Sequence, residues 1–313
     1  MPELDNTKAS CFRTCKRKYY WQHIRGLQSN FGSSAIRYGV TWHGILEGYY
    51  KYIKENGWAD KELAISAALE LGKKKWDEET AKKTFLPDYR TFDAACTALL
   101  HYLSFYQKDE EYIKIINTEA KFKLEIKPDN DDEEQILYYI MDRGDHSALY
   151  FTGRLDLQVE MNFANWILDF KTTSQNLSMQ ASRLNRSGQL IGYSYAGKHA
   201  LEFPTEGCLV GLAYVSAYKS KKTGEYGDVT TDFGRIPQIY NDKDLVEWKK
   251  SFLDTALDIT KSIDSNNWPV NFDSCYQYGP CTYTKLCDQG GKLDDVITEG
   301  YHQEFWDVLK EAD

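Results

Sequence analysis

The chain has 313 residues with a formal net charge of −9, and 42% of its residues are hydrophobic. This length suits one large domain or two small ones, with enough apolar residues for a buried core. No apolar run approaches the roughly 20 residues of a membrane span, and the N-terminus is polar. These features predict an intracellular protein that is not secreted and binds no membrane. The negative charge disfavours a general nucleic-acid binder, but Arg13 to Arg25 includes five basic residues and no acid. A run of this kind can still form a local phosphate-binding patch.

The first third of the chain has helical periodicity. Ser10 is expected to cap a short helix that begins the segment 10–27. In the next helix, His43 lies on the same stripe as Gly39 and Leu46, and it can be either a core residue or a ligand. The first three long helices are expected over residues 35–55, 61–80 and 89–111.

From residue 116 onward the pattern changes to alternation. Strands are expected over 116–126, 136–141, 148–160 and 166–172, with a tight turn at 162–165. A helix at 178–200, a strand at 207–217, a turn at 219–228, a strand at 229–233 and helices at 242–265 and 301–311 follow. This order predicts a mixed α/β fold, in which a central mixed sheet is flanked by helices.

Two carboxylates and a lysine are expected to meet on neighbouring strands. Asp169 and Lys171 are two residues apart in an apolar run, so in a strand they share one face. Asp156 lies on the preceding strand, and the lengths of strand and turn bring it near Asp169. Adjacent carboxylates repel one another unless a cation lies between them, and oxygen ligands suit Mg²⁺ or Mn²⁺. Alone, the Asp169–Lys171 pair is equally typical of an exposed ion pair. With Asp156 it predicts metal-assisted phosphodiester hydrolysis.

The cysteines are unevenly distributed. Cys275, Cys281 and Cys287 follow one another at intervals of six residues, in a chain for which disulfides are a poor default. Together with Cys15 they supply four thiolates, which satisfy either Zn²⁺ or a [4Fe–4S] cluster. Cys11, four residues before Cys15, is a competitor for the fourth position.

Four motifs with chemically active side chains occur in a fixed order, at Gly39–His43, Gly153–Asp156, Asp169–Lys171 and Gln189–Tyr193. They resemble the His, Asp, Asp-x-Lys and Gln-x-x-x-Tyr motifs of the RecB-like branch of the PD-(D/E)XK nuclease superfamily. The sequence Cys-Lys-Arg-Lys-Tyr-Tyr from Cys15, with the three C-terminal cysteines, resembles the iron–sulfur members of that branch. Those include AddB-type nuclease domains and CRISPR adaptation exonucleases. The resemblance spans about residues 10–290.

The resemblance implies a role for each residue of the acidic constellation. His43, Asp156 and Asp169 would ligate the metal ion, with the backbone carbonyl of Phe170 as a further ligand. Lys171 would be the catalytic lysine.

The remaining roles concern the substrate and a second metal centre. Gln189 and Tyr193 would position the scissile strand or the lysine, and Glu119 would lie near the metal ion. Cys15, Cys275, Cys281 and Cys287 would hold a [4Fe–4S] cluster, with Zn²⁺ as the alternative. Two features depart from the pattern: Lys16 stands where a proline is usual, and the spacing of six replaces the Cys-x-x-Cys pair of many relatives.

The resemblance also implies a restriction-endonuclease-like fold in a single nuclease domain over residues 1–313. Within it, residues 28–115 would form a helical subdomain and residues 116–265 the nuclease core. Residues 10–27 and 266–290 would bind the cluster and join the N- and C-terminal segments.

The function implied is a metal-dependent DNA nuclease, an exonuclease on DNA ends or single strands that uses a water held by Mg²⁺ or Mn²⁺. It would act in DNA recombination and repair, in the cytoplasm of a bacterial or phage-infected cell. The chain has no Gly-x-x-x-x-Gly-Lys-[Ser/Thr] motif, so unwinding would need a helicase or recombination partner. Two alternatives stay open: a non-cleaving DNA-binding or assembly subunit with the nuclease fold, and a zinc-stapled structural protein. Tyr19, Tyr20 and Trp21 either stack on DNA bases or belong to the core.

Overall fold

A computed structural model of the chain describes residues 3–144, 147–201, 204–277, 279–288, 297 and 300–310. Its contacts gather into two compact units. The first unit comprises Met1–Phe31, Lys121–Arg154 and Asn241–Asp313, and the second comprises Gly32–Ala120 and Leu155–Tyr240. The predicted domain boundaries stay a prediction, because compactness alone does not define a domain.

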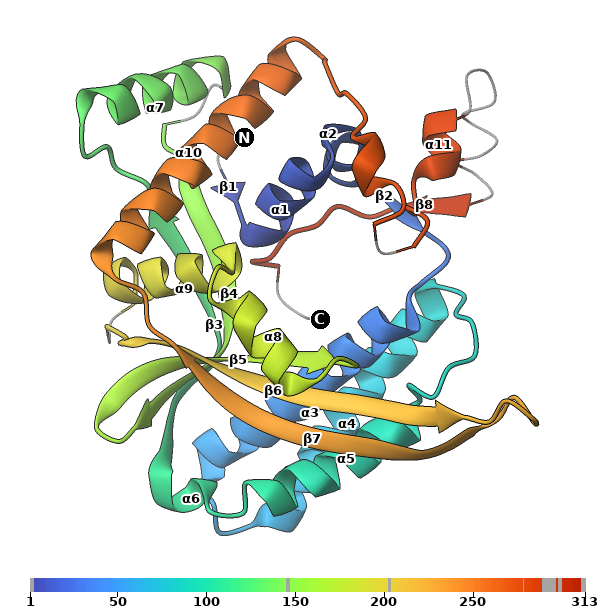
Figure 1. Cartoon of the computed structure of the whole chain (residues 1–313). Helices are drawn as coiled ribbons and strands as arrows, with labels where there is room; N and C mark the ends of the chain where they lie inside the picture. The colour runs from blue at the N-terminus through green and yellow to red at the C-terminus, as the bar shows by residue number, and fades with distance from the viewer. Residues whose placement is uncertain are drawn as a thin grey trace. The chain divides into compact units, whose positions relative to one another are not determined.

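The described elements divide between the units as follows (Figure 1). The first unit holds α1 (Asn6–Thr14), α2 (Lys16–Tyr19), a π-helical turn (Tyr20–Ile24), α7 (Asp131–Gly144), α10 (Asp242–Asp264), a 3₁₀ turn (Phe272–Ser274), α11 (Thr284–Asp288), β1 (Glu3–Leu4), β2 (Leu27–Ser29) and β8 (Tyr301–Gln303). The second holds α3 (Ser34–Asn56), α4 (Lys61–Lys82), α5 (Phe92–Phe105), α6 (Asp109–Tyr112), α8 (Leu177–Leu184), α9 (Gly188–His199), β5 (Ala164–Thr173), β6 (Gly207–Lys219) and β7 (Tyr226–Gln238). The chain passes from unit to unit along β3 (Ile113–Glu125) and β4 (Tyr150–Met161).

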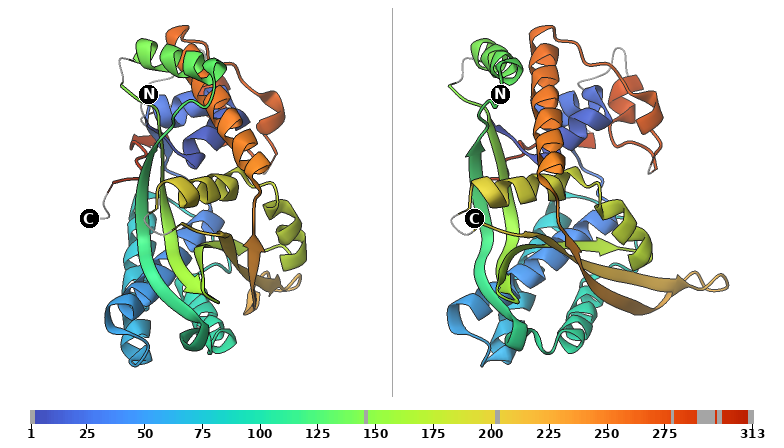
Figure 2. Two further views of the ribbon diagram at one scale, coloured as in Figure 1. Left: turned by 90° about the vertical axis from the view of Figure 1, so that its left-hand side faces the viewer. Right: turned by 60° about the vertical axis from the view of Figure 1, so that its left-hand side comes forward.

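A mixed sheet forms the centre of the second unit. β4 pairs antiparallel with β5, β5 parallel with β6, and β6 antiparallel with β7. Between β5 and β6 the chain forms α8 and α9, the helical crossover that a parallel pair requires. α3, α4 and α5 lie on one face of this sheet, and α8 and α9 lie on the other (Figures 1 and 2). The predicted mixed sheet flanked by helices is therefore confirmed. None of the helices in the described part of the chain is long and apolar enough to cross a membrane.

The sheet is buried on both faces, which explains the apolar run in β5. On one face Phe170 stacks on Tyr50 of α3, with ring centroids 5.9 Å apart. On the other face Ile167 lies against Gly197 of α9. Because both faces are covered, Asp169 is only 2% exposed within this run. A carboxylate buried to this extent needs a charged or hydrogen-bonding partner.

Two segments adopt a different structure from the predicted one. The predicted strand at 136–141 lies inside α7. Four acids, Asp131 to Glu134, occupy the first turn of this helix, where negative charge is favourable. The predicted helix at 301–311 is also wrong over its described part, because residues 301–303 form β8 and pair antiparallel with β2. Its last residue, Glu311, lies outside the described residues.

Three helix boundaries also differ from the prediction. The predicted helix at 178–200 is two helices, since Ser187 caps the start of α9 and accepts a hydrogen bond from Leu190 N. The predicted helix at 89–111 is likewise divided into α5 and α6. Ser10 lies inside α1, and the N-cap is Asp5, whose side chain accepts from Lys8 N at 2.8 Å.

Aromatic side chains join the N-terminal and C-terminal segments within the first unit. Tyr19 and Trp21 are 2% and 4% exposed, and Tyr19 stacks on Trp268 at 6.1 Å between centroids. Tyr283 Oη donates to the carbonyl of Leu27 at 2.8 Å. Of the two interpretations of the aromatic run, the core position therefore holds for Tyr19 and Trp21.

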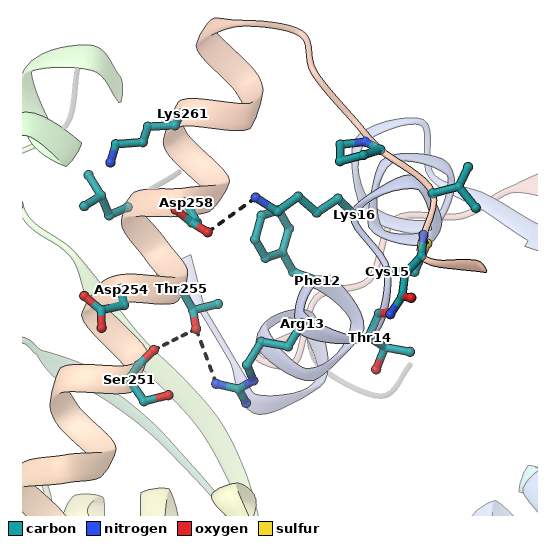
Figure 3. Close-up of a pocket in the computed structure, with 14 residues that line it drawn as sticks. Phe12, Arg13, Thr14, Cys15, Lys16, Ser251, Asp254, Thr255, Asp258 and Lys261 are labelled. Atoms are coloured by element: carbon teal, nitrogen blue, oxygen red, sulfur yellow. Dashed lines mark hydrogen bonds and ion pairs between the residues drawn. The ribbon is translucent and has the colours of Figure 1, made fainter. Parts of the chain in front are cut away.

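The basic run beside these aromatics is largely engaged in the same unit. An open cavity of about 650 Å³ lies between α1–α2 and α10 (Figure 3). At its rim Lys16 Nζ lies 3.3 Å from Asp258 Oδ2, and Arg13 Nη1 donates to Thr255 Oγ1 at 3.4 Å. Nearby, Arg17 Nε donates to the carbonyl of Trp268 at 2.6 Å. These three basic residues therefore help to hold the first unit together.

Stability is expected to depend on pH through His23. Burial, followed by the charges of Lys8 and Lys18, lowers the pKa of His23 from 6.5 to about 4. Both ring nitrogens are buried without a hydrogen-bond partner among the described residues. As pH falls below about 6.5, His23 becomes protonated in the unfolded chain but stays neutral in the folded chain, so the folded state loses stability.

Between pH 7 and pH 5 we expect the free energy of unfolding to fall by about 2 kcal/mol through this group. Urea unfolding of the wild type and of His23→Phe at both pH values measures the effect. The Phe variant should lose that much less stability on acidification. An identical pH dependence in the two proteins would contradict the assignment.

Candidate active site

A two-residue turn sets the register of the hairpin that contains the two aspartates. Asn162 and Phe163 connect β4 to β5 with φ values of 53° and 63°, the left-handed conformation of the tightest hairpin turns. Met161 is paired with Ala164, and the ladder continues to Leu157 opposite Leu168. One step further along the same register, Asp156 lies opposite Asp169. The two carboxylates thus meet on one face of neighbouring antiparallel strands.

The other members of the constellation come from β5 and α3. Lys171 follows Asp169 on the same face of β5, and its Nζ lies 2.7 Å from Asp169 Oδ2. His43 Nδ1 of α3 lies 3.3 Å from Asp156 Oδ2. Asp156 Oδ2 also accepts a hydrogen bond from the backbone N–H of Phe170 at 2.7 Å. Four predicted site residues from three elements are therefore brought together.

A glycine in α3, Gly39, allows this helix to pass close to β5. A Cβ atom at Gly39 would lie 3.4 Å from Thr172 Oγ1 of β5, so the helix passes close to the end of the strand. His43 follows one helical turn later on the same side of α3. Its side chain, 34% exposed, reaches Asp156 from there.

The two carboxylates are electrostatically unlike. Burial raises the pKa of Asp156, but His43, Lys171 and the Phe170 N–H outweigh it, so the net pKa lies below the ordinary value. Burial raises the pKa of Asp169, the charge of Asp156 adds to this, and Lys171 only partly compensates, so the net pKa lies above the ordinary value. Burial lowers the pKa of His43 and of Lys171, but the carboxylates more than offset it, and both pKa values are raised. Of the two carboxylates, Asp169 is therefore the one whose negative charge is less fully compensated by nearby positive charges.

The donor set fits a divalent cation, although it is not arranged as a finished site. Asp169 Oδ2 is buried and, apart from its ion pair with Lys171, accepts no hydrogen bond of regular geometry among the described residues. The charges of Asp156 and His43 act on Asp169, and these two side chains supply further oxygen and nitrogen donors. In the described part of the chain, no three His, Cys, Asp or Glu side chains are yet close enough to hold a metal ion.

Helix α9 brings two more predicted residues to this face. Gln189 Nε2 donates to Tyr193 Oη at 3.1 Å. Burial raises the pKa of Tyr193, and the charges of Asp169 and Asp156 raise it further. The phenol is therefore within electrostatic reach of both carboxylates. Glu119 lies in β3 with a left-handed φ of 50°, and its proximity to the metal stays a prediction.

Two structural features near the site had no clear signal in the sequence. Cys208 of β6 accepts or donates a hydrogen bond with Ser194 Oγ at 3.5 Å and donates to the carbonyl of Leu190 at 3.5 Å. These contacts fix α9 against the sheet. A cavity of about 210 Å³ also lies at the end of β5, where Thr172, Thr173 and Arg90 are among the residues that line it. The position of the two threonine hydroxyls could have been predicted from the sequence, because they directly follow Lys171. Arg90 could not, because it comes from a distant loop.

The predicted cluster ligands all lie in the first unit. Cys15 lies between α1 and α2, and the other three occupy the segment from the 3₁₀ turn to α11. Burial raises the pKa of Cys275 and of Cys287, and the thiols of Cys15 and Cys281 raise both further. The four thiols are thus electrostatic neighbours. They do not form a closed ligand set among the described residues.

Hydrogen bonding separates Cys15 from its competitor Cys11. The backbone N–H of Asn271 donates to Cys15 Sγ at 3.4 Å, which links this thiol to the C-terminal segment. Cys11 Sγ instead donates to Gln22 Oε1 at 3.7 Å, and burial raises the pKa of Cys11 to about 12. These contacts favour Cys15 as the N-terminal ligand.

A known protein family matches most of the chain. The profile of the PD-(D/E)XK nuclease superfamily matches residues 6–288. No curated protein sequence matches significantly. Nine solved chains match in structure. One of them, described as "Crystal structure of SSO0001", has a TM-score of 0.30 and 12% sequence identity, and the match covers 87% of this chain and 92% of that chain.

The mixed sheet flanked by helices is consistent with the fold of this superfamily. The chain belongs to the PD-(D/E)XK nuclease superfamily. Its members are hydrolytic nucleases that act on DNA and usually require Mg²⁺ or Mn²⁺.

Proposed function

We propose that the protein is a metal-dependent deoxyribonuclease, acting as an exonuclease on DNA ends or single strands. The observation that carries the proposal is the buried, under-coordinated Asp169 carboxylate, which lies opposite Asp156 and beside Lys171. Two carboxylates held together at this burial cost free energy unless a cation shares them. A protein that only binds DNA gains nothing from that arrangement.

Each residue has a chemical role in the proposed reaction. Asp156, Asp169, His43 and the carbonyl of Phe170 would hold Mg²⁺ or Mn²⁺. When bound there, the cation would neutralise charge on the phosphodiester and activate the attacking water. The raised pKa of Lys171 keeps its side chain an ammonium ion, which donates a hydrogen bond to the attacking water and offsets the charge that develops on the phosphate oxygens.

The helix over the site supplies the contacts to the substrate. Gln189 and Tyr193 present an amide and a phenol that hold the scissile strand, and their mutual hydrogen bond fixes both rotamers. A cavity also lies at the end of β5, and its Thr172 and Thr173 side chains, together with Arg90, which pairs with Asp88, suit a phosphate of the same strand. A helicase or recombination partner would deliver that strand.

Digestion of end-labelled DNA tests the proposal. Linear and circular substrates, each single- and double-stranded, are incubated with the protein in Mg²⁺, in Mn²⁺ and in EDTA. We expect cation-dependent release of nucleotides from linear DNA, with circular DNA resistant. Cleavage of circular DNA would show that the protein is an endonuclease and not an exonuclease. Binding without cleavage in either cation would indicate the non-cleaving DNA-binding subunit instead.

We also propose that Cys15, Cys275, Cys281 and Cys287 hold a [4Fe–4S] cluster with a structural role. Four neighbouring thiols suit either a cluster or Zn²⁺, and they would join the N-terminal and C-terminal segments of the first unit. Because ligand binding of this kind contributes directly to folding, its loss should destabilise that unit.

Anaerobic purification followed by iron, acid-labile sulfide and zinc analysis tests the cluster. We expect a brown protein with iron and sulfide, and Cys281→Ser should lose both. Cys96→Ser, a change in α5 of the second unit, is the matched control and should retain them. A colourless wild type with stoichiometric zinc would overturn the cluster assignment and support a zinc site.

A further inference from the structure

The face of the sheet that carries the catalytic residues continues beyond them along β6. Lys171 pairs with Leu212, and Thr173, the last residue of β5, pairs with Tyr214. Because paired residues share a face and side chains alternate along a strand, Tyr214 and Ser216 lie on the same face as Lys171. Tyr218 follows them at a register shift of the β6–β7 ladder, between Ala217 and Lys219.

β6 and β7 extend past the end of β5 as a two-stranded arm, comprising residues 214–232 (Figures 1 and 2). From Leu212, beside the catalytic lysine, to Lys219 at the end of β6 the strand spans about 23 Å, at roughly 3.3 Å per residue. The arm therefore reaches well beyond the reaction centre in the direction in which β5 points.

The two faces of the arm differ in what covers them. Val215 and, at the base of the arm, Phe233 belong to the core that the sheet forms with α3 and α5, and they are 3% and 5% exposed. On the catalytic side Tyr218 is 73% exposed. Ser216 Oγ donates to Tyr214 Oη at 2.8 Å, and the paired Thr230 is exposed. One face of the arm is therefore a packing surface, and the other is a half-buried strip of hydroxyls that ends in an exposed aromatic ring.

The tip of the arm is positively charged, in a chain with a net charge of −9. Lys219, Lys221 and Lys222 are exposed there with one acid, Glu225, whereas the other exposed acids of the arm, Asp228 and Asp232, lie further along β7. Lys219 Nζ lies 4.9 Å from the ring centroid of Tyr226, its partner across the two strands of the arm. A local concentration of lysines next to an exposed aromatic ring is the combination by which proteins bind single-stranded nucleic acid.

We propose that the catalytic-side face of the β6–β7 arm is a track for a single DNA strand, running from Lys171 to the lysines at the tip. Tyr218 stacks on a base, the hydroxyls of Tyr214 and Ser216 contact the backbone, and Lys221 and Lys222 bind phosphates. The track is long enough for about seven nucleotides at the duplex rise of roughly 3.4 Å, and for fewer in a stretched strand. The proposal rests on the proposed nuclease function and specifies how that site holds its substrate.

Binding is measured in the full-length Asp169→Asn protein, so that cleavage does not interfere, with a fluorescent single-stranded 20-mer. Adding Tyr218→Ala should raise Kd about 10-fold, because base stacking on an aromatic side chain is worth about 1–3 kcal/mol. Adding Lys221→Gln with Lys222→Gln should reduce the slope of log Kd against log salt by about 1.4, since each phosphate contact on a single strand contributes about 0.7.

The matched controls are exposed residues of the same kinds in the same unit. Tyr112→Ala in α6 and Lys73→Gln with Lys74→Gln in α4 should leave both Kd and the salt slope unchanged. In the cleavage-competent protein the arm variants should raise KM for long strands and leave kcat unchanged. Strands of three nucleotides, too short to reach the tip, should be cleaved equally by all of these proteins.

The outcomes separate the arm from the active site. Unchanged Kd and salt slope in the arm variants, with cleavage by the wild type intact, would overturn the track and leave the nuclease assignment standing. Equal effects from the control variants would also overturn it, since the response would then reflect general charge. A wild type that neither binds nor cleaves DNA would refute both proposals.

Discussion

Replacing Lys171 by alanine is expected to lower kcat for DNA cleavage by about 10³-fold, with DNA binding retained. Removal of one positioned acid–base or charge-stabilising group typically costs 10²–10⁴ in rate. Lys171 is the only cation that the structure places on Asp169, at 2.7 Å among the described residues, so no neighbour is available to take its role. Asp169→Asn should have an effect of similar size, because it removes the buried charge that would attract the metal ion.

Single-turnover cleavage of labelled single-stranded DNA in Mg²⁺ measures both variants, and circular dichroism verifies that they are folded. Lys114→Ala is the matched control, since Lys114 Nζ also pairs with a carboxylate, Glu160, at 3.3 Å, but on an exposed part of β3. It should cleave at the wild-type rate. Wild-type rates in folded Lys171→Ala or Asp169→Asn protein would show that the active site lies elsewhere.

Arg235→Met is expected to destabilise the protein by about 3–5 kcal/mol, because it leaves a buried carboxylate without its partner. Arg235 Nη1 and Nη2 bind the two oxygens of Asp109 at 2.6 Å each. Nη2 also donates to Tyr102 Oη at 2.9 Å and to Tyr50 Oη at 3.2 Å. Arg235 and Asp109 are 12% and 11% exposed, so water cannot replace these bonds. The network connects β7 with α3, α5 and α6.

Urea unfolding of Arg235→Met, Asp109→Leu and the double variant measures the effect. The double variant should be markedly more stable than the sum of the single losses predicts, because it removes both charges together. Lys61→Met is the matched control. Lys61 of α4 pairs at 2.9 Å with Glu110, which follows Asp109 in α6, but Lys61 is 45% exposed. It should cost less than about 1 kcal/mol. Additive losses from the Arg235 and Asp109 variants would show that the two residues act independently.

This network also supports the candidate active site from behind. Tyr50, which contacts Arg235, stacks on Phe170, and Phe170 lies between Asp169 and Lys171 in β5. The face of β5 opposite the catalytic side chains is therefore held by a rigid polar and aromatic cluster. Variants of this network should lower the free energy of unfolding but change the cleavage rate little, since none of its charged groups reaches the face of β5 that carries Asp169 and Lys171.

The local sequence pattern alone was sufficient to predict how the residues at the centre of the candidate site lie. The alternation in residues 155–159, the apolar run at 166–170 and the tight turn between them predict a hairpin, and a period of two places Asp169 and Lys171 on one face. The short turn then leaves little freedom of register, so Asp156 has to lie near Asp169. The mixed sheet flanked by helices follows from the order of elements for the same reason: short connections restrict topology.

Local pattern was insufficient where distant contacts or end effects outweigh it. Residues 136–141 form part of a helix because acids in its first turn interact favourably with the helix N-terminus, and Lys249, 3% exposed, pairs with Glu133 at 2.7 Å. The segment 301–303 is a strand because β2, nearly the whole chain away, supplies its hydrogen-bond partners. Pairings at such separation leave no periodic signal in either segment.

The sequence by itself therefore determined which side chains share a face of β5, because the side-chain period of a strand and a tight turn are local properties. Only the tertiary structure decided which groups from elsewhere meet that face. His43 reaches Asp156 because α3 passes close to Thr172, and α9 holds Tyr193 near Asp169 through Cys208. The same holds for the arm: its lysines are visible in the sequence, but the position of Tyr214 and Ser216 on the face of Lys171 follows from the pairing of β5 with β6. Contacts between distant segments depend on packing, and packing is fixed only when the whole unit folds.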